Sequence, residues 1–95
     1  MHGGQTEVIM SDGTRCDCLT DDIAAEHDFA GKMYEGLTQA LHYGMLTGRQ
    51  AALVLIVEKP GDMKFIERAK RLIEFYNLPI ILFVMDLCEC VPCVP

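Results

Sequence analysis

Hydrophobic and polar residues change period along this chain, and the changes divide it into short segments. Three β-prone runs come first, separated by the turn sequences Ser11-Asp12-Gly13 and Thr20-Asp21-Asp22. The strands predicted from these runs span residues 6–10, 14–19 and 23–29. The first two should form a hairpin, with the third strand beside it.

Helical spacing replaces this alternation between residues 31 and 47, and Gly48 is a typical helix stop. The apolar stripe predicted for this helix consists of Met33, Leu37, Leu41 and Met45. Residues 51–57 are then almost continuously apolar, as in a strand that is buried on both faces, and we expect them to form the central strand of the sheet.

The segment Pro60-Gly61-Asp62 should end this strand and cap a second helix that extends to Asn77, because apolar residues again recur at helical spacing. Residues 79–85 form the last predicted strand. The predicted order is therefore βββαβαβ. This is an α/β fold with a mixed sheet, in which a hairpin-linked antiparallel part is joined to two right-handed crossovers.

Length and charge limit the classes of function. Ninety-five residues are enough for one small domain, which we place at residues 1–87, followed by a Cys/Pro-rich tail at residues 88–95. The formal net charge of −6 argues against a protein that holds long stretches of nucleic acid by phosphate neutralisation alone. Any contact with nucleic acid should therefore be local or assisted by metal ions.

Targeting signals are not evident in the sequence. No apolar run approaches the roughly 18 to 20 residues of a membrane span, so we expect no membrane segment. The amino end also lacks a charged stretch followed by an apolar one, which is the pattern of a signal peptide. The protein is expected to be cytoplasmic if the chain is complete, and exported if a leader has been removed.

Three carboxylates are candidates for a metal site. Glu26 and Asp28 are two residues apart on one predicted strand, so both should leave the same face, and Asp17 lies on the neighbouring strand. Like charges this close need a cation, and hard oxygen ligands in an open site suit Mg²⁺ or Mn²⁺. His27 should point to the other face and offer the metal only its backbone carbonyl. The alternative is that the carboxylates lie on a solvated face of a small sheet.

The helix that follows carries a second, polar stripe. Its members Lys32, Gly36, Gln39 and Tyr43 fall at i, i+4, i+7 and i+11, set apart from the apolar stripe. Lys32 and Gln39 can therefore look toward the edge that holds Glu26. Gln39 and Tyr43 also form the pattern Q-x-x-x-Y within QALHY.

With these motifs the sequence resembles the PD-(D/E)xK nuclease superfamily, whose fold is restriction-endonuclease-like, and in particular its RecB-type members with a helical Q-x-x-x-Y after the catalytic strand. The stretches DGTRCDCLTDDIAAEHDFAGK, LTQALHYGMLTGR and LVLIVEKPGD are similar to those of a group of small bacterial and phage proteins of this type. The resemblance covers about residues 5 to 85. The helix that usually precedes the first strand in the superfamily has no counterpart in this sequence.

The resemblance implies a metal-dependent nuclease that hydrolyses phosphodiester bonds in DNA. Asp17 would match the first aspartate of the motif and Glu26 its (D/E), and both would bind the Mg²⁺ or Mn²⁺ ion. Gln39 and Tyr43 would match the RecB-type helix motif and position the metal site and the nucleic-acid backbone.

The lysine of the motif is displaced in this chain. Asp28 occupies the usual place of the lysine, and the nearest lysine is Lys32 at the start of the helix. The resemblance implies that Lys32, at the start of the helix, would hold or deprotonate the attacking water. Asp28 would belong to the same group of catalytic residues.

Basic residues of the second helix are weaker candidates for nucleic-acid contacts. Lys64, Arg68 and Arg71 share one helix face and could meet phosphates. Glu67 and Glu74 interrupt this face, which favours a solvated surface. Since the chain has no target-recognition insertion, specificity would come from a homodimer or from a protein partner.

Two alternatives remain open. A binding or regulatory module on the same fold that has lost its chemistry would agree with Asp28 in place of the lysine. A thiol or metal-binding protein would instead use the C-x-C-x-x-C tail formed by Cys88, Cys90 and Cys93. The cysteines number five, so they cannot all pair within one chain.

Overall fold

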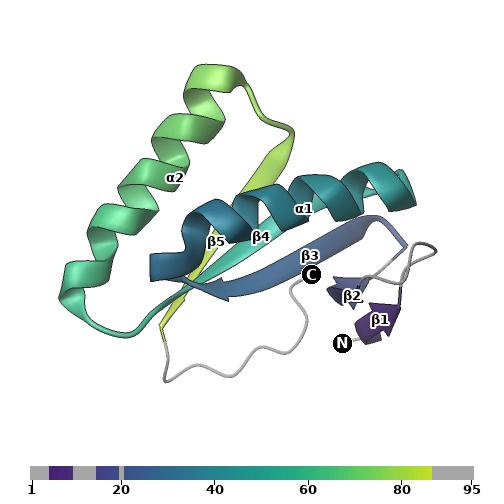
Figure 1. Cartoon of the computed structure of the whole chain (residues 1–95), viewed down its shortest axis with the longest axis horizontal. Coiled ribbons are helices and arrows are strands. Elements are labelled where there is room, and N and C mark those ends of the chain that lie inside the picture. Colours follow the sequence, from purple (N-terminus) through teal and green to yellow (C-terminus); the bar gives the residue numbers. More distant parts are fainter. Residues whose placement is uncertain (1–4, 10–14, 20, 87–95) are drawn as a thin grey trace.

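Five strands form one mixed sheet in the computed structural model of the chain, and two helices lie over one face of that sheet (Figure 1). The structure describes residues 5–9, 15–19 and 21–86, and the side chains of residues 21–85. The predicted turn at Ser11-Asp12-Gly13 and the predicted tail at residues 88–95 lie outside the described residues. The predicted mixed α/β class is confirmed.

The strands are β1 (Gln5–Ile9), β2 (Arg15–Leu19), β3 (Ile23–Phe29), β4 (Gln50–Val57) and β5 (Ile80–Asp86), and they lie side by side in chain order. β2 runs antiparallel to both of its neighbours, β1 and β3, and its pairing with β1 is the predicted hairpin. β3, β4 and β5 are parallel. The sheet therefore changes from antiparallel to parallel pairing at β3.

Each parallel connection contains a short 3₁₀ turn followed by an α-helix. Ala30–Lys32 (η1) leads into α1 (Met33–Thr47), and Pro60–Asp62 (η2) leads into α2 (Met63–Tyr76). A 3₁₀ turn thus precedes each of the two predicted helices, at residues 31–47 and 62–77, whereas the sequence pattern predicted α-helix alone. A crossover of this kind is the usual way to connect parallel neighbours.

Both helices end at a residue in the left-handed conformation. Gly48 has φ 68° and donates its backbone N–H to the Gly44 carbonyl at 2.9 Å. Asn77 has φ 52°, and the next residue, Leu78, donates its N–H to the Ile73 carbonyl at 2.9 Å. Glycine and asparagine are the residues that adopt this conformation most readily, so both stops follow from the sequence.

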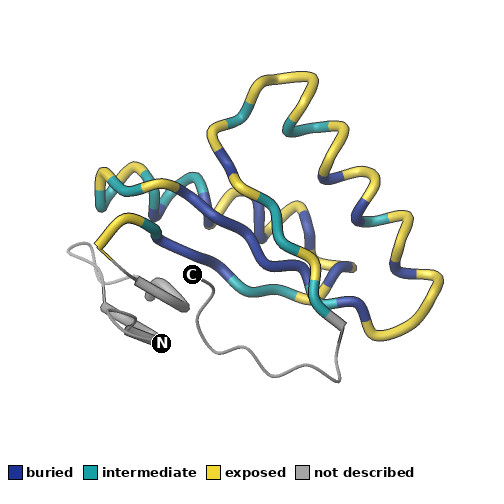
Figure 2. Tube along the Cα trace, turned by 180° about the vertical axis from the view of Figure 1, so that it is seen from behind, coloured by how far each residue is buried: buried dark blue, intermediate teal, exposed yellow. Residues whose placement is uncertain are grey.

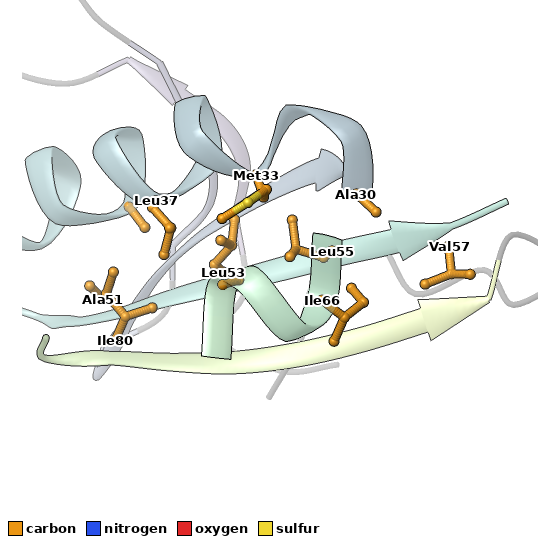
Figure 3. Packing of buried hydrophobic residues seen from close by; sticks show 11 residues of the cluster. Ala30, Met33, Leu37, Ala51, Leu53, Leu55, Val57, Ile66 and Ile80 are labelled. Carbon is orange, nitrogen blue, oxygen red and sulfur yellow. The ribbon is translucent and has the colours of Figure 1, made fainter. Parts of the chain in front are cut away.

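The core lies between the sheet and the two helices. Alternate residues of β4, including Leu53 and Leu55, pack against Met33 of α1 and Ile66 of α2, and all four side chains are at most 1% exposed (Figure 3). Since one cluster contains residues from both helices and from one face of β4, α1 and α2 cover the same side of the sheet.

The opposite face of β4 is buried as well. Ala52 and Ala25 form a second small cluster on that side, with Ile23 and Phe83 packed against it. Seen from behind, the buried positions are concentrated along the inner strands (Figure 2). The predicted burial of β4 on both faces is confirmed. Its predicted central position is wrong, because β3 is the middle strand of the five.

The residues through which α1 packs on the sheet differ in part from its predicted apolar stripe and include smaller side chains. Met45, the last member of the predicted stripe, is 70% exposed, whereas Gly36 and Ala40 are buried. A Cβ added at Gly44 would lie 3.0 Å from the Ala51 Cβ, so the helix backbone approaches the sheet closely at this point. Small residues set the distance between α1 and the sheet, and a pattern of hydrophobic positions does not predict this distance.

Candidate metal and catalytic site

Strand β3 directs two carboxylates toward the helices. Glu26 is in register with Leu53, and Asp28 is in register with Leu55, and both leucines belong to the cluster under the helices. Residues in register on neighbouring strands point to the same face, so Glu26 and Asp28 share the helix-covered side. His27 lies between them and therefore points to the other face. The predicted directions of all three side chains are confirmed.

The two carboxylates differ in burial. Glu26 is only 6% exposed, whereas Asp28 is half-buried and accepts the Phe29 backbone N–H at its Oδ1, at 3.1 Å. Burial of a charged carboxylate costs free energy unless partners or a cation offset the loss of water. A buried glutamate at this position is therefore the kind of ligand that a bound cation would stabilise.

α1 crosses directly above these residues. A Cβ placed on Gly36 would lie 3.4 Å from the Asp28 Cβ, which fixes that point of the helix over the end of β3. From Gly36 to Ala40 the helix rises about 6 Å. From Asp28 back to Glu26 the strand covers about 6.6 Å. By these distances Ala40 lies near Glu26 along the helix, while Gly36 lies against Leu53, whose Cδ1 is 2.8 Å from an added Cβ, and against Asp28.

Strand β2 lies beside β3 and carries Asp17, the third predicted carboxylate. The ladder between β2 and β3 contains the pairs Leu19↔Ala24 and Cys18↔Ala25 among the described residues. One further step along both strands leads to Asp17 and Glu26. The backbone register thus agrees with the expectation that these two residues are neighbours across β2 and β3, although the side chain of Asp17 lies outside the described ones.

The predicted polar stripe of α1 divides into buried and exposed members. At about 100° per residue, Lys32, Gly36, Gln39 and Tyr43 fall within about 60° of one another, on one flank of the helix. The predicted stripe is exposed at Lys32 and Gln39 and buried at Gly36 and Tyr43, with Tyr43 only 6% exposed.

That flank of α1 nevertheless borders the carboxylates, because Gly36 contacts the β3 end of the sheet. Lys32 is the last residue of the 3₁₀ turn after β3 and the N-cap of α1, four residues beyond Asp28. Among the described side chains, the ion pair identified is between Lys70 and Glu67 at 3.7 Å, and Lys32 takes no part in it. The approach of Lys32 to Glu26 or Asp28 stays a prediction.

A complete metal-ligand set is not present within the described side chains. Among them, no three His, Cys, Asp or Glu residues lie close enough to hold one metal ion. The predicted ligands are Asp17, Glu26 and the His27 backbone carbonyl, and this set depends on a side chain outside the described ones. The donor set would be all oxygen, which fits Mg²⁺ or Mn²⁺.

A cavity of about 390 Å³ opens beyond the end of β3, and its lining includes Phe29, Lys59, Lys64 and Phe65. It lies beyond the carboxyl ends of β3 and β4, where ligands usually bind in parallel α/β sheets. Lys64, predicted as a weak nucleic-acid contact, lines it. The turn beside it is fixed by Asp62, whose carboxylate accepts the Glu58 N–H at 2.9 Å.

A larger groove of about 680 Å³ lies between α1 and α2. We call it the aromatic–arginine groove, and it is lined by Tyr34, Arg68, Arg71, Leu72, Phe75 and Tyr76, together with Glu74. The two arginines were expected as weak phosphate contacts. The three aromatic residues were missed by the sequence reasoning, although Tyr34 lies outside the apolar stripe of its helix, which could have indicated an exposed ring.

Comparisons of the chain with protein-family models, with curated proteins and with solved structures found no match. Among the described residues, no helix is both long and apolar enough to span a membrane.

Proposed function

We propose that this protein is a divalent-metal-dependent nuclease that hydrolyses phosphodiester bonds in DNA, with its active site where β2 and β3 pair under α1. One observation carries the proposal. Strand β3 places the buried Glu26 and the half-buried Asp28 on the helix-covered face, beside the point where the described β2–β3 ladder stops. Carboxylates held together on one face of a sheet suit a hard cation.

The arrangement of strands supports the same proposal. An antiparallel β1–β2–β3 unit that continues through parallel β4 is in agreement with a restriction-endonuclease-like core. In this proposal Asp17, Glu26 and the His27 carbonyl hold Mg²⁺ or Mn²⁺. When bound, the ion would supply a nucleophilic water at neutral pH and countercharge for the phosphate and for the leaving oxygen.

The residues of the chain then have separate tasks. Glu26, buried on the helix-covered face, would orient the site, and the half-buried Asp28 would accept hydrogen bonds from solvent or substrate groups. Lys32 ends the 3₁₀ turn after β3, from which its ammonium would approach the water or neutralise a phosphate oxygen. Gln39 is exposed on the same flank and can donate to the nucleic-acid backbone, and the buried Tyr43 supports that flank from inside.

The proposal is tested with Glu26→Gln, which keeps the size of the side chain and removes its charge. Wild-type protein is incubated with single-stranded, duplex and branched DNA in Mg²⁺ or Mn²⁺, and cleavage should require the metal. Glu26→Gln should lose cleavage with an unchanged circular dichroism spectrum. Glu35→Gln is the matched control, because Glu35 is exposed in the first turn of α1.

Lys32→Ala separates an active enzyme from an inactive module. Loss of a positioned proton-transfer group typically lowers a rate by about 10²- to 10⁴-fold. We expect this loss in Lys32→Ala with metal binding retained, and near wild-type rates in Lys70→Ala, because Lys70 pairs with Glu67 and lines neither the cavity nor the groove. Absence of cleavage by the wild-type protein on all three DNA forms would support the binding or regulatory module instead. Thiol counting and metal analysis would test the cysteine-based alternative.

A further inference from the structure

We infer that the aromatic–arginine groove binds single-stranded nucleic acid, with unpaired bases on its rings and phosphates on its arginines. The inference rests on the proposed nuclease function, for which it names the form of substrate. It is carried by two observations that the active-site argument does not use, the exposure of three aromatic side chains and the position of the basic residues.

The aromatic rings of the groove are exposed far beyond what packing requires. Phe75 is 81% exposed, Tyr76 66% and Tyr34 57%. They gather around one groove formed by two helices, rather than lying singly on the surface. Contiguous exposed apolar surface of this kind marks a binding site. Flat rings offer a stacking surface to every base, whatever its identity.

The charge of the groove is opposite to that of the whole chain. The chain carries a formal net charge of −6, yet the groove is lined by Arg68 and Arg71 with Glu74 as its single acidic residue. A polyanion would therefore be attracted locally, at this surface. A second copy docked by twofold symmetry would bring the same arginines against each other, which opposes self-association here.

Basic and aromatic residues continue from the groove toward the proposed active site. Arg68 and Lys64 both lie against the Phe65 ring, at 5.3 Å and 5.2 Å from its centroid. Phe65 and Lys64 also line the cavity beyond the end of β3, with Phe29. Arg68 of the groove and Lys64 of the cavity thus meet at one ring, and Phe29 of that cavity belongs to the β-strand that carries Glu26 and Asp28, so single-stranded nucleic acid could extend from the groove toward these carboxylates.

The experiment measures binding without cleavage. A fluorescein-labelled oligothymidylate is titrated with protein in EDTA and followed by fluorescence anisotropy, beside a duplex of the same length and a labelled polyglutamate peptide. We expect the single strand to bind most tightly, with an affinity that falls as salt increases. Equal or tighter binding of the duplex, or binding of the acidic peptide alone, would overturn the inference.

Matched variants locate the binding. Phe75→Leu should weaken binding roughly ten-fold or more, because base–ring stacking is lost, and the substitution leaves the core unchanged because Phe75 is exposed. Arg71→Gln should weaken binding several-fold and reduce the salt dependence. Lys70→Gln removes the same charge from a residue that pairs with Glu67 outside the groove, and should bind as wild type. Equal losses of affinity in Arg71→Gln and Lys70→Gln would show that the groove is not the binding site.

The two proposals fail separately. Binding without any metal-dependent cleavage would overturn the nuclease and support the groove. Cleavage of duplex DNA by a protein that does not bind the oligothymidylate would support the nuclease and overturn the groove.

Discussion

At the scale of single residues, one side chain fixes the turn that follows β4. Asp62 is 7% exposed, and its Oδ2 accepts the backbone N–H groups of Glu58 at 2.9 Å and Lys59 at 3.3 Å. These amides follow β4 directly, where the chain leaves the sheet and has no ladder partner. The carboxylate therefore holds the turn that aims α2 and shapes the cavity beside Phe65.

Asp62→Ala should lower the free energy of unfolding by about 1–3 kcal/mol, because two backbone donors lose their acceptor. Asp62→Asn keeps a carbonyl oxygen and should lose less. Urea denaturation followed by circular dichroism measures both. Asp21→Ala provides the control, since Asp21 is exposed in a turn and surface substitutions usually change stability by less than about 0.5 kcal/mol. A loss in Asp62→Ala no larger than in this control would contradict the role of Asp62.

Gly48 and Gly61 allow a clean test of backbone conformation. Neither position has an atom within 4 Å of an added Cβ, but only Gly48 has a left-handed φ, at 68°. Gly48→Ala should therefore cost about 1–2 kcal/mol, and Gly61→Ala should be nearly neutral. Thermal and urea unfolding of both variants decide the matter. Similar stabilities of the two variants would show that the left-handed helix stop contributes little.

At the scale of elements, α1 is positioned by small residues. Gly36, Ala40 and Gly44 recur every four residues on its inner side, and an added Cβ at Gly44 would lie 3.0 Å from the Ala51 Cβ and 3.4 Å from the Arg49 carbonyl oxygen. Neither neighbour is a flexible side-chain end. The distance between helix and sheet, and with it the room for Glu26 and Asp28, depends on these contacts.

Gly44→Ala should destabilise the protein although alanine is the better helix former. The gain in helix propensity is about 1 kcal/mol, whereas overpacking typically costs about 1–3 kcal/mol. Combining it with Ala51→Gly removes the opposing Cβ, so a double-mutant cycle should show favourable coupling of at least about 0.5 kcal/mol. Ala52→Gly is the control, because Ala52 faces the other side of β4 and should combine additively. If the changes in stability were additive in both double-mutant cycles, Gly44 would not lie close to Ala51.

At the scale of the whole molecule, the proposed metal site should link ligand binding to stability. The expected ligands come from β2 and β3, so a bound ion would connect the antiparallel hairpin to the parallel part of the sheet. Cation binding by the folded protein alone raises its stability by RT ln(1 + [L]/Kd), about 2.7 kcal/mol at a hundred-fold excess over Kd.

Mg²⁺ or Mn²⁺ at millimolar concentration should therefore raise the Tm of the wild-type protein in differential scanning fluorimetry. The Asp17→Asn, Glu26→Gln double variant should not respond, because the charges that attract the ion are gone. The double variant Asp21→Asn, Glu35→Gln carries the same chemical changes at exposed positions and should respond as wild type. A wild-type Tm that is indifferent to both metals would exclude the site.

The amino-acid pattern determined the elements and the two carboxylates on one face. A two-residue period sends Glu26 and Asp28 in one direction and His27 in the other, and this follows from strand geometry before any tertiary contact exists. Helix ends were equally readable, since Gly48 and Asn77 are the residue types that accept a left-handed φ. Such features depend on neighbours in the chain, so the sequence contains them directly.

Only the tertiary structure decided which surfaces meet. Both crossovers place their helices on one side of the sheet, so Tyr43 became buried while Gln39, four residues earlier on the same flank, stayed in solvent. Likewise, the exposed rings of Tyr34 and Phe75 line one groove because two helices converge from distant parts of the chain. The distance at which elements pack is set by side-chain volumes on both partners, and a one-dimensional pattern does not contain it.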